Sequence, residues 1–261
     1  MGSRQSVKTA LVLCLTALAI YMVLCAVMYW SQDRILYFPT PEIDRPGVQA
    51  LQVKRADATV KVWALHPNAK PALLYFGGNG EDVGSNLHDF ERAFPDRAIY
   101  LVNYRGYGGS TGRPSEAALI ADAEAIYDQV AIQHDQIVVM GRSLGSGVAT
   151  ALASVRPVAG VVLVTPYDSI ANVGAGRYPW LPVRWLIKDS YDSASRMGNV
   201  KAPVLVLVAE HDESILRPRS DALIAAIPAG LGRSVVIRAA THNDIETFPA
   251  YWAVVTGFVG Q

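Results

Sequence analysis

The chain has 261 residues, of which 51% are hydrophobic, enough apolar material for the core of one large α/β domain. Its 23 Lys and Arg residues balance its 23 Asp and Glu residues, so no net charge attracts nucleic acid, and we expect no nucleic-acid partner. Both cysteines, Cys14 and Cys25, lie near the N-terminus, which excludes disulfides and cysteine metal sites from the rest of the chain.

The first predicted element is a membrane helix over Thr9–Trp30. These 22 residues carry no charge and would extend about 33 Å as a helix, roughly the thickness of a bilayer core. A cleaved signal peptide is the alternative, but the apolar run is long for one, and the small-residue triplet at 17–19 falls inside the run. The pattern therefore favours an uncleaved anchor.

Basic residues on either side of this helix bear on its orientation. Arg4 and Lys8 precede the helix together with the amino terminus, while Arg34 and Arg45 follow it. The positive-inside rule favours, by a small margin, a cytoplasmic N-terminus and a folded domain on the extracytoplasmic side, periplasmic or lumenal. We expect a tail and anchor over residues 1–30 and one folded domain over residues 31–261.

Apolar runs of strand length alternate with helical patterns after residue 50, which predicts an α/β fold with a mostly parallel eight-stranded sheet and helices on both faces. Several runs, such as VLVLVA, are continuously apolar, as expected for strands covered on both faces. Ser115 is the expected N-cap of a helix between two of the strands. The expected strands are Leu51–Arg55, Thr59–Leu65, Ala72–Phe76, Ala98–Asn103, Gln136–Met140, Val161–Thr165, Val204–Ala209 and Ser234–Arg238.

Residues 169–200 break this alternation. The segment is too long and irregular for a simple crossover, and its YPWLPVRWLI stretch offers bulky apolar side chains, Trp180 and Trp185 among them. Two interpretations stay open, a helix packed on the sheet and a small cap over a pocket for an apolar substrate.

Two serines fit the pattern GxSxG, which is typical of a nucleophile elbow. Ser143 in GRSLG follows the apolar run QIVVM and precedes the helical pattern SGVATALASV, so it has the required strand before it and helix after it. Ser110 in GGSTG is flanked by further glycines and by Pro114, which indicates a loop. We therefore predict that Ser143 is the nucleophile.

A serine hydroxyl needs a base and an acid that orients the base. Asp212 directly follows the seventh expected strand, 69 residues after Ser143, and His242 follows the eighth, 30 residues later. The carboxyl ends of neighbouring parallel strands converge in space, so these residues can meet. Asp168, after the sixth strand, is the alternative acid. Three other histidines, His66, His88 and His134, are expected to be exposed.

The loop GGNG, residues 77–80, follows the third expected strand and suits an oxyanion hole. We predict that the backbone N–H groups of Asn79 and Leu144 stabilise the oxyanion. The loop lacks the spacing of a phosphate-binding motif, and no metal or other cofactor is expected.

These residues resemble the α/β-hydrolase superfamily, and within it the small membrane-anchored α/β-hydrolase-domain serine hydrolases. The resemblance lies, in chain order, in QDRILYFP, GGNG, NYRGYGGSTGRPSE, GRSLGSGVA, YPWLPV, PVLVLVAEHDES and THND. It assigns Ser110 to a family loop outside the elbow. The sequence departs from the family at Gly77, where a histidine is common, and at Asn103, where an aspartate is usual.

The resemblance implies a two-step acyl transfer on esters or thioesters. Relatives include lysophospholipases, monoacylglycerol lipases, protein depalmitoylases and proteins labelled serine aminopeptidases. The expected function is hydrolysis of lipid-like acyl esters or thioesters by Ser143, His242 and Asp212. The alternatives are an aminopeptidase-like serine peptidase and a catalytically silent, membrane-tethered binding module. The oligomeric state is left open.

Overall fold

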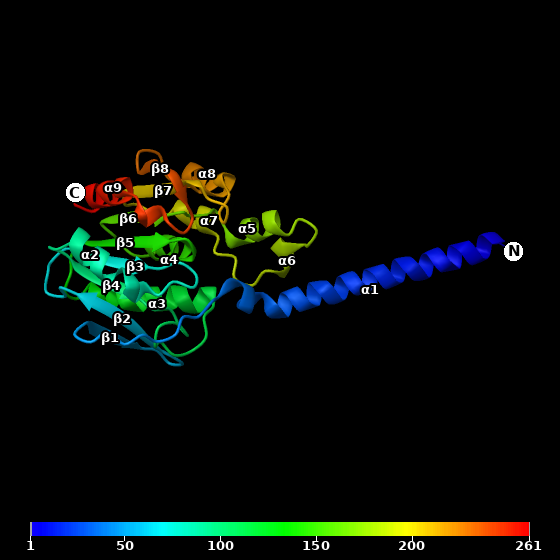
Figure 1. Ribbon diagram of the computed structural model, residues 1–261, viewed down its shortest axis with the longest axis horizontal. Helices are drawn as coiled ribbons and strands as arrows, with labels where there is room; N and C mark the ends of the chain where they lie inside the picture. Colours follow the sequence, from blue (N-terminus) through cyan, green and yellow to red (C-terminus); the bar gives the residue numbers. More distant parts are fainter. Residues whose placement is uncertain (1, 261) are drawn as a thin grey trace.

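A single eight-stranded sheet forms the centre of the computed structural model, which describes residues 2–260 (Figure 1). Its strand order is β1-β2-β4-β3-β5-β6-β7-β8. The pairs β1–β2 and β2–β4 are antiparallel, and every other neighbouring pair is parallel. The strands are β1 (Gln49–Lys54), β2 (Thr59–Leu65), β3 (Ala72–Phe76), β4 (Ala98–Val102), β5 (Ile137–Arg142), β6 (Gly160–Val164), β7 (Val204–His211) and β8 (Gly232–Thr241).

The predicted strands are confirmed in number and order, and their ends differ by a few residues. The largest extension is in β8, which runs from Gly232 to Thr241 because it pairs with β7 along most of its length. Every residue of β3, β4 and β6 is buried, which explains why these strands are apolar throughout.

Helices cover both faces of the sheet and create two hydrophobic cores. One core contains buried side chains of α3 (Glu116–Val130), α4 (Leu144–Ala153), α7 (Ser193–Met197) and α8 (Arg217–Ala226). The other contains side chains of α2 (Leu87–Ala93) and α9 (Pro249–Val259). Short 3-10 turns lie at η1 (Val83–Asn86) and η2 (Ile245–Thr247). The Ser115 hydroxyl accepts a hydrogen bond from the Ala118 amide at 3.3 Å, which confirms the predicted N-cap of α3.

The N-terminal helix α1 (Gly2–Leu36) extends away from the sheet as a long rod (Figure 1). Within residues 2–260 it is the one helix long and apolar enough to cross a membrane. It includes the predicted span Thr9–Trp30 and continues for six residues beyond it.

The irregular segment 169–200 divides into two parts that pack differently. Helix α7 contacts α4 and α8 and so belongs to one layer of the sheet's covering. Helices α5 (Ile170–Arg177) and α6 (Val183–Leu186) lie beyond the sheet, toward α1 (Figure 1). Helix α7 therefore fits the interpretation of a helix packed on the sheet, and a cap formed by α5 and α6 stays a prediction.

Candidate active site

The site begins at the sharp turn between β5 and α4, where Ser143 lies. Ser143 has φ 49° and ψ −116°, a conformation that L residues rarely adopt. Gly141 and Gly145 permit this turn, because a Cβ on Gly145 would overlap with the carbonyl oxygen of Phe76 and a Cβ on Gly141 with the backbone of Gly145. The strained turn is the geometry of a nucleophile elbow.

His242 lies between Ser143 and Asp212 and bonds to both. Its Nε2 is 3.0 Å from Ser143 Oγ, and its Nδ1 is 2.8 Å from Asp212 Oδ2. Asp212 follows the buried part of β7 and His242 follows β8, so neighbouring parallel strands deliver the acid and the base. The Asp212 side chain is 3% exposed and that of His242 12%, which shields both bonds from water. This arrangement can move a proton from the serine to the imidazole.

Asp212 is oriented by its own loop. Its Oδ1 accepts hydrogen bonds from the backbone N–H groups of Ser214 at 2.9 Å and Ile215 at 2.7 Å. These bonds fix the carboxylate so that its Oδ2 lies 2.8 Å from His242 Nδ1.

The alternative acid and the alternative nucleophile make hydrogen bonds outside the site. Asp168 bonds to Arg219 at 3.0 Å and to Asn172 at 2.6 Å, whereas Asp212 contacts His242. Ser110 Oγ accepts from the Lys61 amide and donates to the Asn103 carbonyl, so its hydroxyl ties two backbone segments together. The geometry therefore favours Asp212 over Asp168 and Ser143 over Ser110.

One prediction about the other histidines is wrong. His134 is 2% exposed, because its ring bonds to the hydroxyl of Tyr100 at 2.8 Å and to the Lys70 carbonyl at 3.1 Å. His134 is therefore a buried structural residue, and its hydrogen-bond partners lie outside the candidate active site.

The GGNG loop lies beside Ser143, since a Cβ on Gly78 would be 3.7 Å from Ser143 Cβ. Asn79 Oδ1 accepts hydrogen bonds from the Phe38 amide and the Tyr107 hydroxyl, both at 2.9 Å. Across residues 2–260, the N–H groups of Asn79 and Leu144 have no protein acceptor, as the predicted oxyanion donors require. The oxyanion role of these two N–H groups stays a prediction.

Glu81 braces this loop, and sequence analysis did not identify it. One carboxylate oxygen accepts hydrogen bonds from the Gly78 amide at 2.6 Å and from Arg142 at 3.0 Å, and the other accepts from the Tyr75 hydroxyl at 2.7 Å. The Tyr104 hydroxyl also donates to the Gly77 carbonyl at 2.8 Å. These bonds hold the loop, in which Gly77 stands where the sequence resemblance implies a histidine.

Arg142, between the first glycine and the nucleophile, links the two sides of the site. Besides Glu81, it donates to the carbonyl oxygen of His242 at 3.0 Å. Burial opposes its charge, but Glu81, Tyr75 and Glu246 outweigh burial and raise the pKa of the Arg142 guanidinium above its usual value. Arg142 is therefore a permanent cation that joins the oxyanion loop to the histidine loop.

A cleft of about 1010 Å³ opens next to these groups. Its lining includes Asn79 of the GGNG loop, Ser214 of the Asp212 loop, Ile35 in the last turn of α1 and Phe38 just after it. Residues of helix α5 and three arginines, Arg177, Arg184 and Arg219, also line it. The cleft therefore separates the site from the part of segment 169–200 that lies beyond the sheet.

Comparison with known proteins places the chain in the same class of protein as the fold and site geometry do. A family model described as the alpha/beta hydrolase fold matches residues 71–196. The Mycobacterium tuberculosis protein Rv2307c is 37% identical to the chain, over 83% of this chain and 83% of its own length. Protein bem46 of Schizosaccharomyces pombe is 25% identical, over 95% of this chain and 92% of its own length.

A solved esterase, Pf2001 of Pyrococcus furiosus, has the same fold. It superposes with a TM-score of 0.68 at 14% identity and covers 85% of this chain and 98% of its own. The chain belongs to the α/β-hydrolase family. Membership of this family supports a general hydrolase activity on a small-molecule substrate.

Proposed function

We propose that the protein is a serine hydrolase that cleaves carboxylic ester or thioester bonds through an acyl-enzyme intermediate. The observation that carries the proposal is the hydrogen-bonded series from Ser143 Oγ through the His242 ring to the Asp212 carboxylate. The strained turn at Ser143 and the two unpaired N–H groups beside it support the same chemistry.

In the first step, Ser143 Oγ attacks the acyl carbonyl carbon while its proton passes to His242 Nε2. The N–H groups of Asn79 and Leu144 donate to the carbonyl oxygen as it becomes negative. When the intermediate collapses, the bond to the leaving group breaks, and that group takes the proton from His242. Water then attacks the acyl-enzyme with His242 as base, which releases the acid and restores the Ser143 hydroxyl.

We propose a lipid-like acyl substrate at a membrane. Support comes from the apolar helix α1, whose last turn reaches the cleft through Ile35, and from the apolar side chains of segment 169–200. Contacts between this segment and α1 favour a retained anchor over a cleaved signal peptide, because cleavage would expose the apolar surface they cover. The domain is proposed to lie on the extracytoplasmic side.

A fluorophosphonate probe tests the nucleophile. The detergent-solubilised chain is expected to be labelled, and Ser143→Ala is expected to lose the label completely. Ser110→Ala is the matched control, because Ser110 fits the same short pattern, and this variant should stay labelled. An unlabelled wild-type chain, or a label that survives Ser143→Ala, contradicts a Ser143 nucleophile.

A substrate panel tests the bond that is cleaved. p-Nitrophenyl esters of increasing chain length are compared with amino-acid p-nitroanilides, which report aminopeptidase activity. We expect turnover of the esters, lost in Ser143→Ala. Turnover of the anilides alone would contradict the esterase proposal and identify the protein as a peptidase.

A further inference from the structure

One face of α1 packs against segment 169–200 far along the predicted membrane span. Tyr21, Cys25, Met28 and Gln32 follow each other at intervals of four, three and four residues, which places them on one side of the helix. Cys25 is 7% exposed, whereas its near neighbour Val27 is 54% exposed. The helix therefore has a protein-facing side and a side left open.

Hydrogen bonds mark both ends of this contact. The Tyr21 hydroxyl donates to the Trp180 carbonyl at 3.0 Å. Gln32 donates to the Leu186 carbonyl at 3.2 Å and accepts from the Lys188 amide at 2.7 Å. Eleven residues separate Tyr21 from Gln32, so the contact extends for about 16 Å along the helix.

The position of this contact places part of the segment at the depth of a bilayer. Tyr21 lies nine residues before Trp30, the end of the uncharged run, or about 14 Å inside the span. Trp180 and Trp185 are 52% and 89% exposed, although large aromatic side chains are usually buried. A lipid surface is the environment in which such side chains are stable beside a membrane helix.

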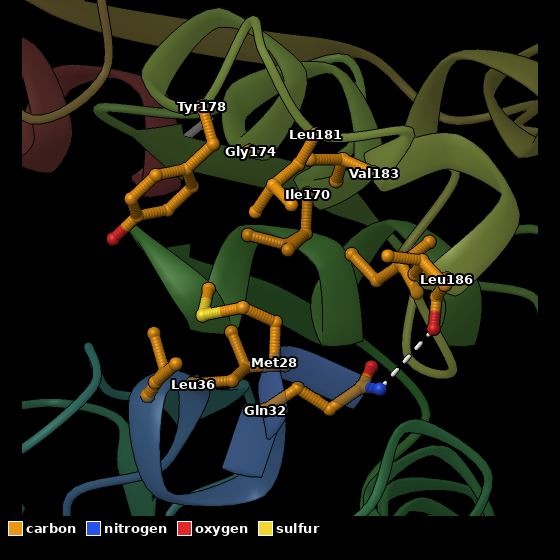
Figure 2. Close-up of a pocket in the computed structure, with 11 residues that line it drawn as sticks. Met28, Gln32, Leu36, Ile170, Gly174, Tyr178, Leu181, Val183 and Leu186 are labelled. Carbon is orange, nitrogen blue, oxygen red and sulfur yellow. Dashed lines mark hydrogen bonds between the residues drawn. The ribbon is translucent and has the colours of Figure 1, made fainter. Parts of the chain in front are cut away.

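An apolar cavity of about 130 Å³ separates the two partners. Met28 and Leu36 of α1 face Ile170 and Leu181 across it (Figure 2). The one amide group in its wall, that of Gln32, is turned to the Leu186 carbonyl. Apolar cavities of about 150 Å³ hold a six-carbon ring, so this one can hold part of a hydrocarbon chain.

The cavity adjoins the cleft beside the candidate active site, because Ile35 lines both. A chain in the cavity would therefore extend toward the cleft that Asn79 and Ser214 line. The cleft is lined by Arg177, Arg184 and Arg219 beside apolar side chains, whereas the lining of the cavity is almost entirely apolar. The two together match a molecule with a polar end and a hydrocarbon end.

We propose that α1 forms one wall of the acyl-chain site, and that the chain of a membrane lipid enters it from the bilayer. This inference rests on the proposed acyl hydrolysis at Ser143. The membrane helix then has two roles, to hold the enzyme in the bilayer and to select the length of the acyl chain.

The test compares chain-length selectivity in full-length variants in detergent micelles. The measured quantity is the ratio of kcat/KM for p-nitrophenyl dodecanoate to that for p-nitrophenyl butyrate. Met28→Trp fills the cavity and should lower this ratio at least about tenfold, since one methylene group in a hydrophobic pocket changes selectivity about 10- to 200-fold. Met28→Ala enlarges the cavity and should move the preferred ester toward longer chains.

Val27→Trp is the matched control, because it places the same side chain on the open side of α1. Its ratio should stay within about twofold of the wild type. Fluorophosphonate labelling of each variant reports whether the site at Ser143 is intact. Equal ratios in Met28→Trp and the wild type, or an equal loss in Val27→Trp, overturn the acyl-site proposal. Ser143-dependent turnover of butyrate in those same samples would leave the proposed function standing, so the two failures are distinguishable.

Discussion

Arg142 and Glu81 join parts of the site that are far apart in the chain. Their ion pair at 3.0 Å connects the elbow to the oxyanion loop, and the bond from Arg142 to the His242 carbonyl adds the histidine loop. Both side chains are largely buried, 15% and 10% exposed, so water cannot replace either partner. The alignment of Ser143, His242 and the GGNG loop therefore depends on two charged residues that are not themselves proposed to be catalytic.

Glu81→Gln should lower the free energy of unfolding by up to about 3 to 5 kcal/mol, because it removes the carboxylate bonded to the buried Arg142 cation and leaves the more distant Glu246, at 3.8 Å, as its counter-ion. Urea unfolding in detergent micelles, followed by tryptophan fluorescence, measures the change. Asp128→Asn breaks the pair with Arg156, in which Asp128 is 55% exposed, and should cost less than about 1 kcal/mol. Equal losses of unfolding free energy in the two variants would contradict a larger contribution from the buried pair.

Asp212→Asn should lower kcat for p-nitrophenyl butyrate about 10⁴-fold, because the amide can hold His242 in the tautomer that cannot accept the serine proton. Asp168→Asn is the comparison, since Asp168 contacts Arg219 and Asn172. Its kcat should stay within about tenfold of the wild type. A larger loss of kcat in Asp168→Asn than in Asp212→Asn would show that Asp168, and not Asp212, is the acid that acts with His242.

At the scale of elements, α4 packs so closely on the ends of β3 and β5 that no side chain fits between them. Gly141 and Gly145 lie at the two sides of the elbow, and the backbone of Phe76 contacts Gly145 directly. The apolar pattern of the strands and the small residues of α4 predicted these elements correctly. Packing of backbone against backbone is the reason that the elbow requires glycine on both sides.

Gly145→Ala should destabilise the domain by about 1 to 3 kcal/mol or more, because the methyl group meets the Phe76 backbone, which cannot rotate away. Gly257→Ala in α9 is the control, since its added Cβ would meet no atom within 4 Å other than its chain neighbours and its own helix backbone. This control should stabilise the helix by up to about 1 kcal/mol. The midpoints of urea unfolding compare the two, and a neutral Gly145→Ala would contradict the close packing.

At the scale of the whole molecule, the sheet domain and helix α1 share a surface. Segment 169–200 bonds to α1 at Trp180 and at Leu186, and the cleft lies between this segment and the carboxyl edge of the sheet. The site therefore lies at the end of the domain that carries the helix (Figure 1).

A cysteine at position 128 tests the orientation of the domain. The two native cysteines, Cys14 and Cys25, both lie in α1, and Asp128 is half exposed on α3. In intact bacterial cells, a membrane-impermeant maleimide should label Asp128→Cys and leave the wild-type chain unlabelled. Labelling of the variant only after permeabilisation would place the domain in the cytoplasm.

The sequence by itself determined the parts of this protein that depend on local signals. Continuous apolar runs predicted the strands, and glycine spacing singled out Ser143 between a strand and a helix. Because parallel strands bring their carboxyl ends together, chain order alone was enough to group Asp212 and His242 with it.

Only the tertiary structure decided the contacts between distant segments. His134 lies next to turn residues, yet Tyr100 and Lys70 bury it, and no local pattern reports such partners. Glu81 is one charged residue in a loop, so its role as a brace becomes visible when Arg142 lies beside it. A helix that is apolar on all sides has no periodicity to reveal which face packs, so the contact of α1 with segment 169–200 is a property of the folded chain.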